Sequence, residues 1–360
     1  MKPKQILILG VILGVLALGI LLKAWVRSAG EGSVSDTRAV SVLPDFDPVK
    51  VERILIARGS QVAPVELANE NGAWKVKSLW NAPANSVKVE NLIRQLPSIH
   101  GELRATGKEL LKDFGIEDAD SFSIRLLGNG DKPLADLRVG TKKSGAAGSF
   151  VRKAGGSDVY GVDMDLADAL GIYTGFETAK PKGDVWADLS LFRLDPEKVT
   201  RIELYLSKGD ENTRVLGLAR EVDPKDPGKS SWKYLREEMR LPVDPDKIMR
   251  FIATMNSVRA EKVVDPSGRG YGLEKPVWRL GVTEDGKEKV LGAGPKNTAE
   301  NRCYVRGLAG ASVFSLAGAY FEDLNKDDTN FVKDAVPPGF AKVPPLQKDK
   351  TLPSGAGQNP

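Results

Sequence analysis

The chain has 360 residues, of which 41% are hydrophobic and 28% charged, and its net charge at pH 7 is +4. This is the composition of a globular protein long enough for about two domains of ordinary size. Acidic and basic residues are interspersed, which argues against a nucleic-acid groove. The single cysteine, Cys303, excludes an internal disulfide, and the single histidine, His100, excludes His-rich metal sites.

The N-terminus predicts a transmembrane anchor over residues 1–27. Ile6 to Leu22 carries no charge and would rise about 26 Å as a helix, close to the thickness of the bilayer core. A cleaved signal peptide is the alternative, but Lys23 and Arg27 stand where small residues of a cleavage site are expected. The short basic tail before the span favours a cytoplasmic N-terminus. We therefore expect a single-pass protein of the cell (inner) membrane with its body on the extracytoplasmic side.

Two polar segments are predicted to lack regular structure. Residues 28–45 are rich in glycine, serine and threonine, which is typical of a flexible stalk. Residues 336–360 combine many prolines with glycine and lysine and show no periodicity, which predicts a disordered tail.

Between these segments the sequence repeats itself. Phe46 to Ile54 (FDPVKVERI) matches Leu194 to Ile202 (LDPEKVTRI) at six of its positions, and each copy starts a series of corresponding landmarks. We interpret this as a first repeat over 46–193 and a second over 194–335. A period of this length indicates a duplicated domain, because solenoid repeats have periods of about 20–50 residues.

Each repeat is expected to begin with strands and then a helix. Val51 to Arg58 alternates like a strand, and Val65 to Val76 is typical of a hairpin around a glycine turn. Apolar residues from Val89 to Leu103 follow helical spacing, although Pro97 should kink or end that helix. In the second repeat Asp244 caps a helix whose first residue is proline. The tryptophans of Trp74-Lys-Val and Trp232-Lys-Tyr are interpreted as core anchors.

A turn, a meander of three strands and a short helix should complete each repeat. Asp113-Phe-Gly-Ile-Glu117 corresponds to Gly270-Tyr-Gly-Leu-Glu274, and Phe150-Val-Arg152 corresponds to Tyr304-Val-Arg306. The predicted fold class is therefore α+β: an N-terminal transmembrane helix followed by two tandem repeats, each an antiparallel sheet packed by one long helix.

Two glycine-rich loops are superficially like nucleotide-binding loops. Gly140 to Gly145 lacks the Gly-Lys-Ser/Thr ending of a phosphate loop, and Gly292 to Asn297 lacks the third glycine of a dinucleotide fingerprint. We reject both. His100 is expected in a surface or capping role at the helix end, and Cys303 as a buried, inert thiol.

Basic residues recur at matching places near the meander loops. Lys142, Lys143 and Arg152 in the first repeat correspond to Lys296 and Arg306 in the second. Together they form a candidate contact for an anionic partner, such as phosphate head groups or an acidic surface. The alternative is that they are ordinary solvated cations.

Several motifs give the chain a resemblance to the bacterial family named "domain of unknown function 4340". They are Trp74-Lys-Val76, Pro83 to Leu96, Asp113-Phe-Gly-Ile116, Phe150-Val-Arg152 with Val159-Tyr160, and Trp186-Ala-Asp-Leu189 followed by Leu191-Phe192. The second repeat departs from them, since Tyr271 replaces the phenylalanine and no Trp-Ala-Asp-Leu follows. The resemblance implies a single-pass anchored protein, often encoded beside ABC-type permeases, and implies no reaction.

The residues indicate no catalytic group, cofactor or metal ion. The first hypothesis is a non-enzymatic, membrane-tethered envelope module whose two domains bind a transporter subunit or another envelope protein, as an accessory to an ABC-type transport system. The second is a binder of an anionic envelope polysaccharide or lipid through the five basic residues. The third is a carboxylate-dependent hydrolase, which would need two facing acidic residues in a deep cleft. No nucleic-acid partner is expected.

Overall fold

A computed structural model of the chain describes residues 39–43, 46–61, 64–144, 148–173, 178–236, 239, 241–307 and 310–333. The predicted anchor (1–27), most of the predicted stalk and the predicted tail (336–360) lie outside these ranges. Within them, none of the helices is long and apolar enough to cross a membrane.

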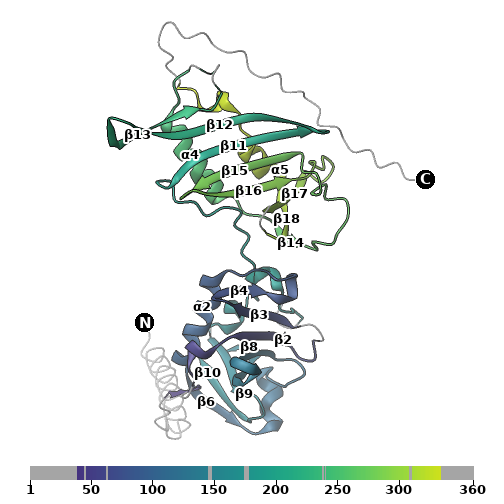
Figure 1. Ribbon diagram of the computed structural model, residues 1–360. Helices are drawn as coiled ribbons and strands as arrows, with labels where there is room; N and C mark the ends of the chain where they lie inside the picture. Colours follow the sequence, from purple (N-terminus) through teal and green to yellow (C-terminus); the bar gives the residue numbers. More distant parts are fainter. Residues whose placement is uncertain are drawn as a thin grey trace, which may run out of the picture.

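Two antiparallel sheets make up most of the described chain; in Figure 1 the first lies in the lower half and the second in the upper half. The first sheet has ten strands, in the spatial order β5 (Ala82–Pro83), β4 (Ala73–Val76), β3 (Val65–Glu70), β2 (Arg53–Arg58), β7 (Phe122–Leu127), β8 (Pro133–Ser144), β9 (Gly148–Lys153), β10 (Asp158–Val162), β6 (His100–Thr106) and β1 (Val40–Ser41). The second has eight, in the order β13 (Asp226–Tyr234), β12 (Glu211–Asp223), β11 (Val199–Lys208), β15 (Trp278–Glu284), β16 (Lys287–Ala293), β17 (Arg302–Gly307), β18 (Val313–Ala317) and β14 (Lys262–Val264).

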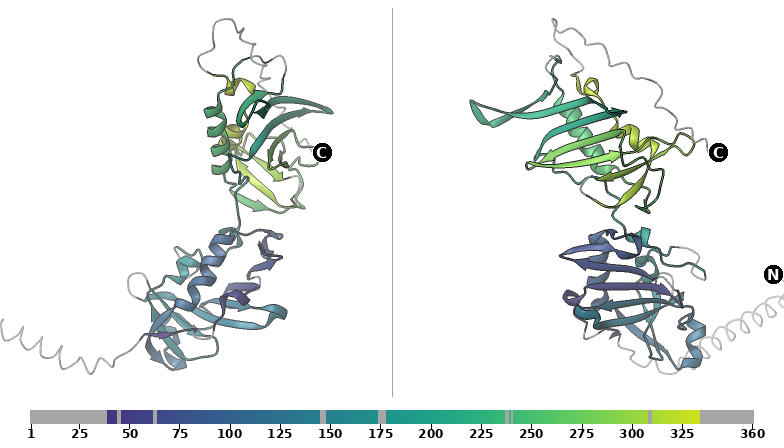
Figure 2. Two further views of the ribbon diagram at one scale, coloured as in Figure 1. Left: turned by 60° about the vertical axis from the view of Figure 1, so that its left-hand side comes forward. Right: turned by 45° about the vertical axis from the view of Figure 1, so that its right-hand side comes forward.

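The helices are few and short. They are α2 (Ser86–Gln95), α3 (Leu166–Ala169), α4 (Pro245–Ser257) and α5 (Gly318–Leu324), with 3₁₀ turns η1 (Pro48–Lys50), η2 (Lys77–Leu79), η3 (Leu96–Ser98), η4 (Lys108–Phe114), η5 (Asn129–Asp131), η6 (Gly183–Trp186) and η7 (Asp328–Phe331). Figure 2 shows α2 and α4 each lying against one face of its sheet. The α+β class is confirmed. The prediction of one long helix per sheet is wrong, because α2 has 10 residues and α4 has 13.

Pro97 explains why the first helix is short. Because proline has no backbone N–H, α2 gives way at Leu96 to the 3₁₀ turn that contains Pro97. The chain then enters β6, so Leu103, which was predicted to lie in the helix, lies in a strand and is 45% exposed. His100 is exposed at the start of β6 and not at the end of a helix.

The two sheets have the same strand order. The first sheet contains the order β4-β3-β2-β7-β8-β9-β10-β6, and the second has the order β13-β12-β11-β15-β16-β17-β18-β14. Strands at the same place in the two orders also come at the same place along the chain within each unit. The first sheet adds only the short edge strands β5 and β1. We call residues 40–182 the first unit, residues 183–195 the connecting segment and residues 196–333 the second unit.

Local sequence explains the equivalent turns and helix starts. The β3–β4 turn places Asn71 and Gly72 at positive φ, and the β15–β16 turn does the same with Asp285 and Gly286, as tight antiparallel hairpins require. Helix α2 is capped by the Asn85 side chain, which accepts the Lys88 N–H. Helix α4 is capped by Asp244 with Pro245 following.

Apolar side chains that alternate along the strands form the core. Ile54, Ile56, Ile202 and Leu204 point inward and are fully buried. They belong to one hydrophobic cluster that includes buried residues of both units. Trp74 is 5% exposed, as a core anchor should be, whereas Trp232 is only partly buried against the cluster.

A leading segment pairs with the strand region after the helix in each unit. In the first unit, Val40–Ser41 form β1, and Val42 donates its N–H to the Ile99 carbonyl at 3.0 Å. In the second, Ala260 donates to the Leu189 carbonyl at 2.8 Å, and Ser190 pairs with Arg259. The predicted stalk (28–45) is therefore wrong at residues 40–43, which belong to the first sheet and its core.

A closing segment also pairs with the start of the helix in each unit. Asn85 donates to the Trp186 carbonyl at 2.7 Å, and Asp244 donates to the Phe331 carbonyl at 2.8 Å. Lys88 and Lys247 occupy equivalent positions of α2 and α4. The Lys88 ammonium group donates to the Val185 carbonyl, and that of Lys247 donates to the Val332 carbonyl. Phe331 thus takes the place of the tryptophan in the first unit's Trp-Ala-Asp-Leu motif, which the second unit lacks.

Candidate functional site

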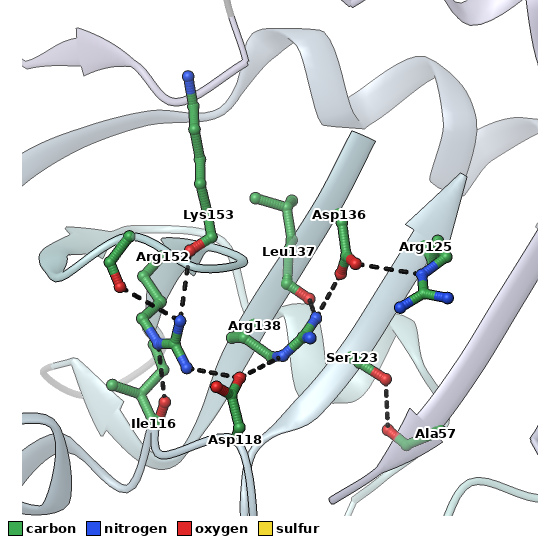
Figure 3. A network of polar contacts seen from close by, with 11 residues as sticks. Ala57, Ile116, Asp118, Ser123, Arg125, Asp136, Leu137, Arg138, Arg152 and Lys153 are labelled. Atoms are coloured by element: carbon green, nitrogen blue, oxygen red, sulfur yellow. Dashed lines mark hydrogen bonds and ion pairs between the residues drawn. The ribbon is translucent and has the colours of Figure 1, made fainter. Parts of the chain in front are cut away.

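Arg152 on β9 is buried and fully engaged by the first unit. Its side chain is 2% exposed, and Figure 3 shows protein groups around its guanidinium. Nε donates to the Ile116 carbonyl at 3.0 Å, Nη2 donates to Asp118 at 2.7 Å, and Nη1 reaches the carbonyls of Lys153 and Gly156. The prediction that Arg152 contacts an anionic partner is wrong, because its donors are used inside the protein.

Asp118 links Arg152 to a row of charges on the outer face of the sheet. Burial by itself raises the pKa of Asp118, but hydrogen bonds from Arg138 and Arg152 outweigh it and keep this pKa below its usual value. Arg138 also pairs with Asp136, which pairs with Arg125 (Figure 3). Acids and bases alternate along this row and leave little uncompensated positive charge.

The other four predicted contact residues do not form one basic surface. Lys142 on β8 is exposed, and its ammonium group donates to the Asp113 carbonyl at 2.8 Å. Lys143 lies beside it, with its side chain outside the described part. In the second unit Lys296 pairs with Glu322 at 3.0 Å, and Arg306 donates to the Leu273 carbonyl at 3.3 Å. Three residues of the candidate site therefore belong to the first unit and two to the second, and protein groups neutralise or engage those whose side chains are described.

The matching arginines instead hold matching turns. Arg152 binds the Ile116 carbonyl, as Arg306 binds the carbonyl of Leu273, the equivalent residue of the second turn. Aromatic pairs accompany both contacts: the Phe114 and Phe150 rings lie 4.8 Å apart, and the Tyr271 and Tyr304 rings 4.3 Å apart. These repeated motifs are thus structural, since they fasten a turn onto a strand.

The rejected glycine loops take part in the same fastening. A side chain at Gly140 would meet the carbonyl oxygen of Phe114, and one at Gly294 would collide with that of Tyr271. Gly115 and Gly272 take positive φ in the two turns. Gly140 and Gly294 therefore allow close backbone approach between these loops and the two turns.

The connecting segment closes the first unit. The fully buried Trp186 accepts a hydrogen bond at its carbonyl from Asn85, and Asp188 donates to the Pro83 carbonyl at 2.8 Å. The Lys88 ammonium lies 5.0 Å from the centre of the Trp186 ring and donates to the Val185 carbonyl at 3.3 Å. Burial lowers the pKa of Lys88, and the charge of Asp168 partly offsets this.

The same segment is then hydrogen-bonded directly to the second unit. Shortly after Trp186, the Leu189 carbonyl accepts the Ala260 N–H, and Ser190 pairs with Arg259. Asn256 at the end of α4 accepts the Leu194 N–H and donates to the Leu194 carbonyl, both at 2.8 Å. The backbone between the units is therefore hydrogen-bonded to both.

A groove of about 950 Å³ lies along this segment. Its walls come from both units; the lining residues are Asn85, Val87, Asp184, Val185, Ala187, Asp188, Leu189, Ser190, Phe192, Arg193, Leu194, Asp195, Asn256, Arg259 and Glu284. Arg193 pairs with Asp188 at 2.7 Å. A hydrogen bond from Lys289 and another from the Asp195 N–H lower the pKa of Glu284. We call this the interunit groove.

A second hollow of about 300 Å³ continues from the interunit groove along α2. The two share Asn85 and Val87. The remaining lining residues of the second hollow are Lys88, Asn91, Leu92, Gln95, Asp168, Ala169 and Tyr173. We call it the α2 groove.

The sequence analysis assigned none of the interunit groove residues to a site. The Asp-Pro pair that both repeats share marks the end of the connecting segment, and that signal locates Leu194 and Asp195. Nothing in the sequence indicates that Asn256 and Arg259 would reach this segment. In the described ranges, no three His, Cys, Asp or Glu side chains are placed to hold a metal ion.

The fold and the grooves define a class of protein: two α+β units of identical strand order joined by a shared backbone segment. The chain belongs to the family described as a domain of unknown function (DUF4340), whose model matches residues 74–238 and again residues 232–338. Both matches begin at the tryptophan of equivalent strands, Trp74 on β4 and Trp232 on β13. No curated protein and no solved structure matches the chain significantly.

Proposed function

We propose that this protein is a non-enzymatic, membrane-tethered binding subunit that holds a partner protein at the interunit groove. Residues 1–27 anchor it in the inner membrane, and the body lies on the extracytoplasmic side. The partner belongs to an ABC-type transport system, in line with the resemblance of the sequence. The two units are tandem copies of one ancestral domain.

One observation carries this proposal. The interunit groove has walls from both units and runs along a backbone segment bonded to both, so its shape is fixed by the fold. A preformed groove loses little conformational entropy when a partner binds. Its lining combines apolar residues with charged ones, as in interfaces that form and dissociate.

Site-specific crosslinking in intact cells tests the proposal. A photo-crosslinking amino acid replaces Val87, which lines the groove and is 64% exposed, and in a matched control it replaces Val222, which is 58% exposed and outside the groove. We expect an adduct with an integral membrane protein of a transporter from position 87 alone. No adduct there, or the same adducts from both positions, would contradict the proposal.

Membrane attachment is tested separately. The full chain should stay with the membrane pellet after an alkaline carbonate wash, and a chain lacking residues 1–27 should be released. A protease added outside the inner membrane should digest the body in the full chain. Release of the full chain by the wash, or protection of the body, would contradict the tether or its orientation.

A further inference from the structure

The exposed face of α2 carries two side-chain amides that bond to no other residue in the described part of the chain. Asn91 and Gln95 line the α2 groove and are exposed, and their side-chain amides form no hydrogen bond within the described residues. They are four positions apart on one face of the helix, which separates them by about 6 Å along its axis. Each amide offers both a donor and an acceptor.

This spacing matches the repeat of an extended polypeptide. Alternate residues of an extended chain are about 6.6 Å apart. One backbone residue can therefore give its N–H and C=O to Asn91, and the next but one can give them to Gln95. The buried Leu92 between the two amides supplies an apolar floor, and the exposed Val87 lies where the two grooves meet.

The charge of the grooves indicates the charge of the occupant. Five acidic and three basic side chains line the two grooves: Asp168, Asp184, Asp188, Asp195 and Glu284 against Lys88, Arg193 and Arg259. Asp168 and Asp184 are exposed and form no salt bridge within the described ranges. An anionic polymer is disfavoured here, and lysine or arginine side chains are favoured.

Resting on the binding function proposed above, we infer that the α2 groove and the interunit groove together bind an extended, basic polypeptide segment of the partner. Asn91 and Gln95 bond its backbone, and Asp168 and Asp184 attract its basic side chains. Tyr173, which lines the α2 groove and is 63% exposed, covers the apolar side chains of the segment. Backbone bonding gives affinity and the acids give selectivity, as in other modes of extended-peptide recognition.

Fluorescence anisotropy with the full-length protein in detergent tests this inference. The probe is a labelled octapeptide of alternating lysine and valine; its counterparts replace lysine by glutamate or carry N-methyl groups on alternate backbone nitrogens. We expect the lysine peptide to bind and the other two to bind at least about tenfold more weakly, since two or more hydrogen bonds or the charge attraction are lost.

Variants on the same helix supply a matched control. Asn91→Ala with Gln95→Ala should weaken the lysine peptide by about tenfold or more, whereas Glu90→Ala with Arg94→Ala, exposed one position earlier and outside the groove, should change it less than about twofold. Asp168→Asn with Asp184→Asn should remove most of the salt dependence of binding.

Three results would overturn the inference: equal binding of the lysine and glutamate peptides, tolerance of the N-methyl groups, or no effect of losing both amides. A tenfold gain in affinity on removing residues 334–360 would assign the groove to the chain's own C-terminus and also overturn it. A crosslink from position 87 together with any of these results would leave the binding function standing. If the peptides bind as expected but position 87 gives no crosslink in cells, the result would contradict the proposed binding of a transporter partner and leave the peptide inference standing.

Discussion

The side chain of Asn256 and the backbone of Leu194 are joined by two hydrogen bonds, one in each direction and each 2.8 Å long. Asn256 lies in the last turn of helix α4, and Leu194 lies near the end of the connecting segment. A side-chain amide here does what a neighbouring strand would do, satisfying both backbone groups of one residue. The pair fixes the connecting segment to the second unit at the edge of the interunit groove.

Replacing Asn256 should therefore destabilise the second unit. Asn256→Ala leaves the Leu194 N–H and C=O without their partner, which costs roughly 1–3 kcal/mol of unfolding free energy. Urea unfolding monitored by tryptophan fluorescence measures this loss. Asn91→Ala removes an amide that has no partner among the described residues and should cost less than about 0.5 kcal/mol. Equal losses in the two variants would show that the Leu194 contact contributes nothing.

Arg152 should matter more for stability than its counterpart Arg306. Arg152→Met leaves the buried Ile116 carbonyl without its donor and removes one of the two arginine partners of Asp118, and we expect a loss of about 3 kcal/mol. Arg306 is partly exposed and reaches one carbonyl at 3.3 Å, so Arg306→Met should cost about 1 kcal/mol. Thermal unfolding of both variants gives the comparison, and a larger effect at Arg306 would contradict it.

Gly294 should tolerate no side chain. A Cβ there collides with the Tyr271 carbonyl oxygen, so Gly294→Ala must displace the turn that Arg306 and Tyr304 hold. We expect a loss of about 1–3 kcal/mol. Gly307→Ala is the control, because the nearest atom to its added Cβ is 3.9 Å away, and it should stay within about 0.5 kcal/mol of the wild type. A neutral Gly294→Ala variant would contradict the close approach.

Asp328 should make stability fall as the pH rises. Burial raises the pKa of this carboxyl group, although the Gly217 N–H and Arg236 oppose the shift. A folded-state pKa above the unfolded value means that the stability contributed by the proton is complete below about pH 3.8 and is lost as the pH rises through the folded pKa. Asp328→Asn should escape this loss, so its unfolding free energy relative to the wild type should increase from pH 3.8 towards neutrality.

Asp265 provides a control of opposite sign for that experiment. Hydrogen bonds from the Ser267 side chain and backbone lower its pKa, so its contribution to stability is present above the unfolded pKa and is lost as the pH falls through the folded one. Asp265→Asn should therefore lose stability relative to the wild type as the pH rises. Urea unfolding between about pH 2 and 7 measures both slopes, that of Asp265→Asn mainly below about pH 3.8 and that of Asp328→Asn above it, and slopes of the same sign would contradict the assignment.

The sequence by itself determined the repeated α+β plan. Local signals can be recognised from the sequence alone because they act over a few positions. Here they are the alternating apolar residues, the Asn-Gly and Asp-Gly turns, and the capping residues Asn85 and Asp244. The family resemblance also came from such motifs, including Trp74-Lys-Val76. The same local reading placed the first helix correctly up to the proline, and missed β6, which forms because β10 and β1 pair with it.

Only the tertiary structure decided what the basic residues and the connecting segment do. Arg152 looks like a surface cation because an alternating strand exposes one face, but the turn at Ile116 folds over that face and buries it. Asn256 and Leu194 are far apart in the chain, so no local pattern could predict their contact. The groove depends on such long-range contacts, and it exists only when both units have folded around the segment between them.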